Sequence, residues 1–264
     1  MSIFERKTPL EKEWETLRKK EARFFKSRLN KKDSVLNQAL EDKVPATLQG
    51  KLDVAFAKAF LLVFEKGTDI IEKTYKKEEL EQQFQINQFA DQVKQSKKSI
   101  RTFSKKAGSA GAKNLALSGA SGVGLGLLGV GLPDIPLFIG MILKDIYEIA
   151  LNYGYRYDTP KEKYFILQII RGALTYGEEV LVIDEEINHF MKTDLLPAGY
   201  DLDTQIQETS QGLSKELLYM KFLQGIPLVG AVGGAYDAVY MKRIHEYASL
   251  KYQRRFLNDY PKHR

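Results

Sequence analysis

The chain of 264 residues lacks cysteine and contains only three histidines, His189, His245 and His263. The absence of cysteine excludes disulfides, thiolate zinc sites, iron–sulfur clusters and cysteine nucleophiles. The first seven residues include basic side chains but no apolar run after them, so we expect no secretory signal peptide. Both observations predict a cytoplasmic protein.

Period-2 alternation bounded by hairpin turns is also lacking, which predicts an all-α, multi-helix bundle. Capping boxes at Thr8–Glu11 and Thr159–Glu162 mark two helix starts. We divide the chain into N-terminal basic amphipathic helices, residues 1–90, and a helical domain, residues 91–264, packed as one unit. Other helices are expected at about 48–66, ended by Gly67 in the left-handed conformation, and at about 78–106, 178–192, 203–223 and 227–258, with a loop at 195–200.

Charge is unevenly distributed around a net value of +6. Residues 175–216 contain ten acids and two lysines, whereas residues 94–113 contain seven cations and no acid. The second cluster predicts an anionic membrane surface as a partner. Nucleic acid is disfavoured because no nucleic-acid-binding motif accompanies the cations. The seven cations are Lys94, Lys97, Lys98, Arg101, Lys105, Lys106 and Lys113, and a further basic group at the C-terminal end comprises Lys242, Arg243, Lys251, Arg254, Arg255, Lys262 and Arg264.

Residues 114–133 contain no charge and many glycines. Three interpretations stay open: a close-packed helix pair in the core, an interfacial or re-entrant hairpin, and a membrane span. The G-x-G-x-x-G match at 124–129 lacks the preceding strand of a dinucleotide site, so we expect no cofactor. A second glycine-rich apolar stretch, 222–236, resembles the first, either because the bundle is pseudo-symmetric or by chance.

Four sequence segments resemble the EcsC family of bacterial proteins: Gly131–Pro136, Ile149–Tyr155, Ile226–Ala231 and Tyr252–Leu257. The resemblance covers about residues 95 to 258. It implies a membrane-linked accessory role, because the family takes its name from a protein encoded beside the subunits of a bacterial ABC transporter. ABC transporter subunits are therefore expected partners. The resemblance supplies no catalytic residues.

An alternative function is a soluble hydrolytic or metal-dependent enzyme with an acidic site between the two apolar segments. Glu185 and His189 would share a helix face near Asp184, which suits a divalent metal or simply a solvated acidic surface. Tyrosines 147, 153, 155 and 157 are typical of packing or of an interfacial belt. Five residues could form a polar site between the central helices: Asp134, Asp145, Glu148, Arg171 and Asp237. A structural ion-pair cluster is the alternative interpretation of the same residues. Asp134 is also suited to cap the helix that follows it.

Overall fold

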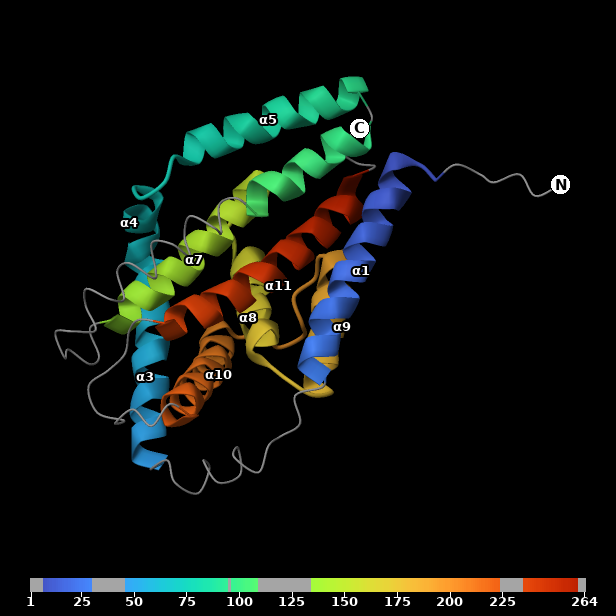
Figure 1. Ribbon diagram of the computed structural model, residues 1–264. Coiled ribbons are helices and arrows are strands. Elements are labelled where there is room, and N and C mark those ends of the chain that lie inside the picture. The colour runs from blue at the N-terminus through green and yellow to red at the C-terminus, as the bar shows by residue number, and fades with distance from the viewer. Residues whose placement is uncertain (1–6, 30–45, 95, 109–133, 224–234, 261–264) are drawn as a thin grey trace.

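The computed structural model describes residues 7–29, 46–94, 96–108, 134–223 and 235–260, which form helices and connecting turns without any strand (Figure 1). The predicted all-α class is confirmed. A helix at residues 97–108 follows α5 in the chain. The other elements are α1 (Pro9–Leu29), α3 (Ala46–Leu62), the π-helical turn η1 (Val63–Gly67), α4 (Thr68–Glu72), α5 (Lys77–Lys94), α7 (Asp134–Asn152), α8 (Pro160–Leu174), α9 (Glu179–Thr193), α10 (Leu202–Leu223) and α11 (Ala235–Asp259).

Both predicted capping boxes begin helices. At α1 the Glu11 amide donates to Thr8 Oγ1 over 3.2 Å, and the Thr8 amide donates to Glu11 Oε2 over 2.7 Å. At α8 the Glu162 amide donates to Thr159 Oγ1 over 3.2 Å. The carboxylate of Glu162 does not complete the box, because it turns toward α11 instead. Each box satisfies amides that the first helical turn leaves without a partner.

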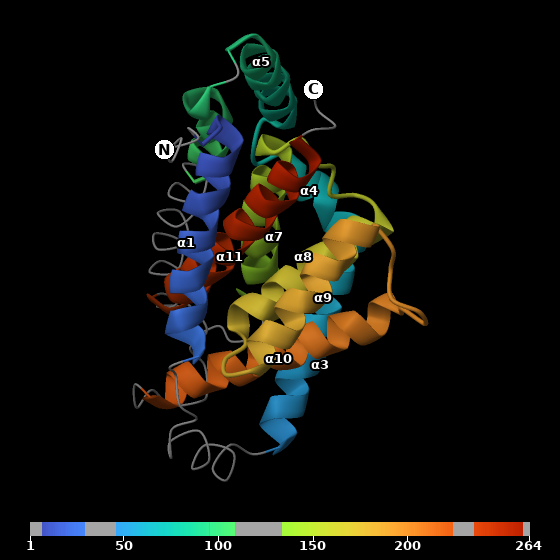
Figure 2. The same cartoon turned by 90° about the vertical axis from the view of Figure 1, so that its right-hand side faces the viewer.

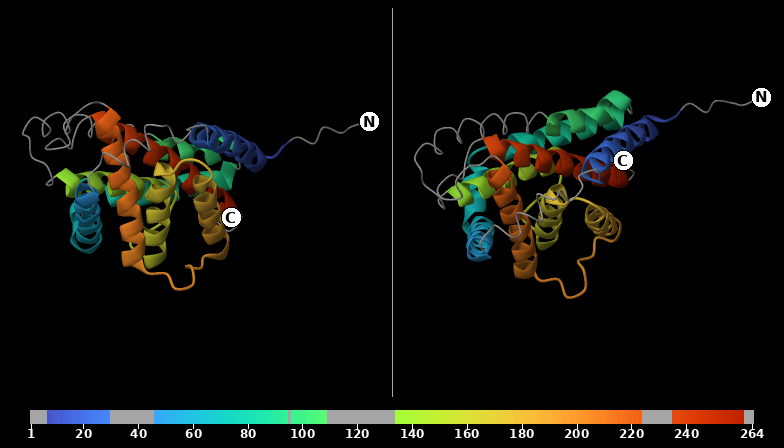
Figure 3. Two further views of the ribbon diagram at one scale, coloured as in Figure 1. Left: turned by 90° about the horizontal axis from the view of Figure 1, so that it is seen from below. Right: turned by 60° about the horizontal axis from the view of Figure 1, so that its bottom comes forward.

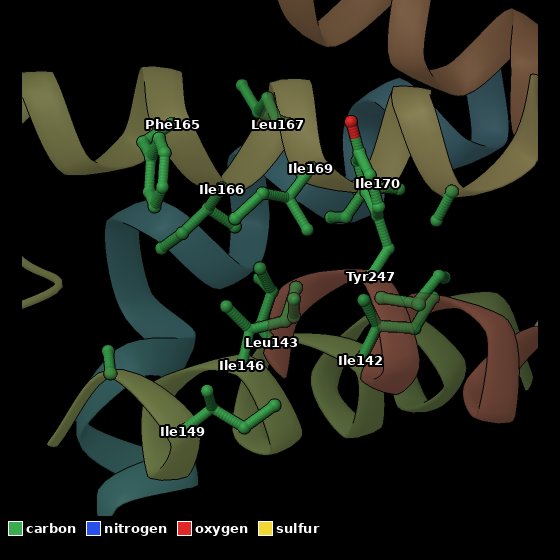
Figure 4. Close-up of a cluster of buried hydrophobic side chains, with 14 of the residues drawn as sticks. Ile142, Leu143, Ile146, Ile149, Phe165, Ile166, Leu167, Ile169, Ile170 and Tyr247 are labelled. Carbon is green, nitrogen blue, oxygen red and sulfur yellow. The ribbon is translucent and has the colours of Figure 1, made fainter. Parts of the chain in front are cut away.

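Helix α8 lies at the centre, packed against α9, α10 and α11, and its side chains from Tyr164 to Ile170 are all buried. Helix α7 packs against α3, α5 and α11. Figure 4 shows Ile142 and Ile146 of α7 pointing toward Ile166 and Ile170 of α8, with Tyr247 of α11 beside them. This aliphatic layer removes apolar surface from water and holds the central helices in a fixed relation.

The helices of the first ninety residues pack directly on the later ones. Helix α1 lies along α11 and also touches α9, while α3 packs on α10 and α7 (Figure 2). Seen from below, α8, α9 and α10 stand side by side, with α11 crossing over them (Figure 3).

Two predicted helix limits are wrong. The helix expected at 78–106 is two helices, because Ser96 begins a new one: the Ser99 amide donates to Ser96 Oγ over 3.1 Å. Gly67 does not end its helix, since its φ of −91° and ψ of −18° are right-handed and α4 follows directly. The π-helical turn η1 carries the chain through this glycine, so no left-handed cap forms.

The predictions for the two glycine-rich segments concern residues that lie wholly or largely outside the described ranges. Residues 114–133 lie outside the described part of the chain, as does most of 222–236, so the three interpretations of the first and the pseudo-symmetry stay predictions. None of the helices in the described ranges is long and apolar enough to cross a bilayer.

Candidate functional site

Six of the seven predicted lipid-binding cations are exposed, at the end of α5 and along the helix of residues 97–108. Lys113 lies outside the described residues. Within the described chain, none of Lys94, Lys97, Lys98, Arg101 and Lys105 lies within ion-pairing distance of a carboxylate. We call this surface the basic corner; it comprises Lys94, Lys97, Lys98, Arg101, Lys105 and Lys106, all exposed.

The basic corner is held by an internal carboxylate. Asp91 is the only acid between residues 82 and 106, and it is 5% exposed. It accepts hydrogen bonds from the hydroxyls of Ser99, in the second helix, and Tyr260, after α11. Phe103 packs on Phe84 of α5 and on Phe256 of α11. The single negative charge of this region is therefore turned inward, and the positive charges stay on the outside.

Helix α5 carries an apolar stripe that leads to the basic corner. Ile86, Phe89 and Val93 recur at helical spacing and are 62%, 67% and 67% exposed. Figure 1 shows α5 along the edge of the molecule, with the helix of residues 97–108 beside it. Three large apolar side chains on one helix face, ending next to Lys94, form a surface of the kind that marks interaction sites.

The C-terminal basic group is arranged differently, because four of its cations on α11, Arg243, Lys251, Arg254 and Arg255, pair with acids from other helices. Arg254 binds Glu21 of α1 through two hydrogen bonds, and Arg255 Nη1 donates to Glu162 Oε2 of α8 over 2.7 Å. Tyr252 donates to the other oxygen of Glu162 over 2.5 Å. These cations tie α11 to its neighbours and leave little free charge for a partner.

Lys251 is the most buried of these cations, with no exposed side-chain surface. It pairs with Asp184 of α9, which also accepts from Tyr247 Oη over 2.6 Å and from Asn188 Nδ2 over 2.8 Å. Burial lowers the pKa of Lys251, and the charge of Asp184 opposes that shift. Asp184 is thus turned into the core and away from the surface of α9.

The segment Ile149–Tyr155 closes α7. Gly154 has a φ of +80°, the Tyr155 amide donates to the Ala150 carbonyl over 2.9 Å, and the Gly154 amide donates to the Leu151 carbonyl over 3.0 Å. This is a glycine helix cap of the Schellman type. A Cβ on Gly154 would overlap the ring of Phe84, so α5 can dock on the cap only if this position has no side chain.

The segment Tyr252–Leu257 supplies two ion pairs of α11, those of Arg254 and Arg255. A family model matches residues 11–257. The chain belongs to the EcsC protein family. The match begins in α1, well before residue 95, where the sequence resemblance was expected to begin. The family pattern therefore includes the N-terminal helices that pack on α11 and α10. Searches of curated proteins and of solved structures find no match.

The predicted polar site is only partly assembled in this EcsC protein. Asp145 and Glu148 lie on α7, where Asp145 pairs with His245 of α11 and Glu148 with Lys144 over 2.6 Å. Arg171 pairs with Glu208 of α10 over 3.0 Å instead of joining them. The side chains of Asp134 and Asp237 lie outside the described set, so any part they play stays a prediction.

The acidic face of α9 borders a hollow of about 930 Å³ between α8, α9 and the loop at 195–198. Glu186 accepts there from Gln168 Nε2 over 2.9 Å, and His189 lies on the same wall. The described residues contain no group of three or more histidines and acids arranged to hold a metal ion. Asp184, predicted to join Glu185 and His189, points to α11 instead.

The tyrosines near the end of α7 are packing residues. Tyr147 stacks on Tyr157 with ring centroids 4.0 Å apart, and Tyr153 is buried. Tyr157 Oη donates to Glu72 Oε1 of α4 over 2.5 Å and accepts from Tyr75 over 2.7 Å. Burial raises the pKa of Tyr147 and Tyr157, so both hydroxyls stay protonated at neutral pH. An interfacial belt is not formed by these buried rings.

Proposed function

We propose that this protein binds the surface of anionic membranes through the basic corner and the apolar stripe of α5. The observation that carries the proposal is the coincidence of three highly exposed apolar side chains with five cations, Lys94, Lys97, Lys98, Arg101 and Lys105, that have no carboxylate partner among the described residues. Cations attract anionic headgroups, while Phe89 and its neighbours can enter the interface between headgroups and acyl chains. Either feature alone would bind weakly, and together they form a two-part anchor.

The charges elsewhere on the molecule favour one orientation. Figure 2 places α5 at the top, with α9 and α10 in the lower half. Glu178, Glu179, Glu185 and Glu186 of the α9 region are exposed. Repulsion from anionic lipid would keep this acidic region away from the membrane, and attraction would turn the basic corner toward it. The protein would then lie at the cytoplasmic face of the membrane as a peripheral protein.

Membership of the EcsC family supports an accessory role for the bound protein, beside an ABC transporter or another secretion-linked membrane complex. In this role the basic corner holds the protein on the bilayer, and the remaining helical surfaces are free to meet transporter subunits. Isolation of the protein from native membranes after crosslinking tests the partnership. Transporter subunits should be recovered with the unchanged protein and lost with a variant that no longer binds lipid.

Vesicle flotation tests the membrane proposal itself. The full chain should float with vesicles that contain phosphatidylglycerol and not with phosphatidylcholine alone, and 0.5 M salt should release it because salt screens exposed charge. The triple variant Lys97→Gln, Lys98→Gln, Arg101→Gln should bind about 100-fold more weakly, given roughly fivefold for each cation near the surface.

The matched control removes the same charge from another exposed surface. Lys12, Lys20 and Arg23 are exposed cations of α1, and their replacement by glutamine lowers the net charge equally. This control should retain most of the binding. Equal loss in both triple variants would mean that total charge alone governs binding, and failure of the unchanged protein to float on any vesicle would overturn the proposal.

A further inference from the structure

Asp145, His245 and Ser249 form a row of hydrogen-bonding groups between α7 and α11. His245 Nδ1 lies 2.9 Å from Asp145 Oδ2, and Ser249 Oγ lies 3.4 Å from His245 Nε2. The two ring nitrogens of one imidazole therefore face a carboxylate and a hydroxyl. This order of groups is the one that activates a serine hydroxyl as a nucleophile.

Asp145 is the most buried of the three residues. The Asp145 side chain is 1% exposed, the His245 side chain is 14% exposed, and Ser249 is partly exposed. A buried carboxylate fixes the ring and its tautomer with little competition from water, and the histidine and the serine are both partly exposed. A base held by a buried acid beside a partly exposed hydroxyl is the arrangement that a serine nucleophile requires.

The positions of these groups are fixed by regular structure. His245 and Ser249 are four residues apart on α11, so they share one helix face. Asp145 lies on α7 between the buried residues Ile142 and Ile149, which belong to the central apolar layer. Groups carried on two packed helices hold their mutual geometry better than groups on loops do.

The pKa of His245 is raised by its contact with Asp145, as expected for a general base that a carboxylate stabilises in its protonated form. Burial lowers its pKa, but the hydrogen bond and charge of Asp145 outweigh burial, with help from Glu246 and Glu148, so that the pKa lies above the usual value. Lys144 is the cation nearby on α7, and it is paired with Glu148.

We propose that Ser249, His245 and Asp145 catalyse acyl transfer from carboxylic esters to water. Ser249 Oγ bonds to the ester carbonyl carbon while its proton passes to His245 Nε2. The ester C–O bond then breaks, and the leaving alkoxide takes that proton from His245 and departs as an alcohol. Water attacks the acyl-serine by the same route and gives a carboxylic acid and free Ser249. Asp145 stays ionised and positions the ring.

The place of Ser249 within α11 defines the substrate class. Amides in the middle of a helix donate to carbonyls of the same helix, so α11 offers no free N–H to the developing oxyanion at Ser249. Substrates with a good leaving group depend least on such donors. The site should therefore act on activated acyl esters and react with organophosphorus reagents that trap activated serines.

The test uses the full chain and a biotinylated fluorophosphonate, followed by peptide mass spectrometry. Ser249 should carry the label, and Ser249→Ala should abolish it. His245→Gln should slow labelling on the order of 100-fold or more. Ser104→Ala, at a partly exposed serine of residues 97–108 that donates to the Arg101 carbonyl, is the matched control and should change nothing.

Positioning by Asp145 is tested by the pH profile, since a merely structural residue would not shift it. Labelling should rise with pH as His245 loses its proton, and Asp145→Asn should move that rise to lower pH and reduce the plateau. Circular dichroism verifies the fold of each variant. If a variant fails to fold, the test rests on the labelling of Ser249 in the unchanged protein and on the pH dependence of that labelling. Absence of label at Ser249, or a rate in the unchanged protein that shows no histidine ionisation, would overturn the proposal.

Discussion

The two basic regions of this protein look alike in the sequence and differ in the structure. Three cations of α11, Lys251, Arg254 and Arg255, face Asp184, Glu21 and Glu162 on other helices, whereas those of the basic corner face solvent beside one buried acid, Asp91. A cation surrounded by partly buried acids is part of the core. A cation on a helix face whose only acid is turned inward is available to a partner. Local charge counts cannot separate these cases.

The largest effect should come from breaking an ion pair of α11. Arg255→Gln leaves Glu162, which is 3% exposed, with an uncompensated charge, and among the described residues the Tyr252 hydroxyl is the one side-chain donor that remains. We expect a loss of about 3 to 5 kcal/mol in the free energy of unfolding, measured in urea. The double variant Arg255→Gln, Glu162→Gln removes both charges and should recover part of the loss.

A smaller stability effect, dependent on pH, should arise at His245. Its pKa is raised in the folded state, so its contribution to stability is fully present below about pH 6.5, its unfolded value, and is lost as pH rises through the folded value. The unchanged protein should lose stability over that window relative to His245→Gln. If the free energies of unfolding of the two proteins change in parallel with pH, the contact with Asp145 does not raise the pKa of His245 in the folded state.

The smallest stability effect should come from the basic corner. The triple variant Lys97→Gln, Lys98→Gln, Arg101→Gln should change the free energy of unfolding by no more than about 0.5 kcal/mol per site, because these side chains are exposed and have no carboxylate partners in the described chain. Thermal unfolding checks this result. A marked loss of stability would place these cations in the core, as in α11, and would remove the contrast.

Much of the fold could be predicted from the sequence, because helix starts and apolar periodicity are local signals. The boxes at Thr8 and Thr159 locate α1 and α8 to within a residue. The break at Ser96 was missed because serine is also compatible with a helix interior. The helix end predicted at Gly67 is wrong because a helix cap and a π-helical turn both accommodate glycine.

The candidate site could be predicted only in part. The basic corner was predicted from its run of cations, but the exposure of Ile86, Phe89 and Val93 depends on which face of α5 meets α7. The ion pairs of α11 join residues as far apart as Glu21 and Arg254, and the contact of Asp145 with His245 joins α7 to α11. Periodicity carries no information on such partners. The four-residue spacing of His245 and Ser249 was visible, but that spacing is too common to indicate a site.

The basic corner and the α5 stripe are the surface that we propose touches lipid. The lack of cysteine allows one reactive thiol to be placed at will. Phe89→Cys and Leu195→Cys are matched sites, because both native side chains are 67% exposed, and each variant can carry an environment-sensitive fluorophore. With anionic vesicles the probe at 89 should shift to the blue and brighten, while the probe at 195 stays unchanged. A shift at 195 alone, or at neither site while the protein binds, would show that another surface touches lipid.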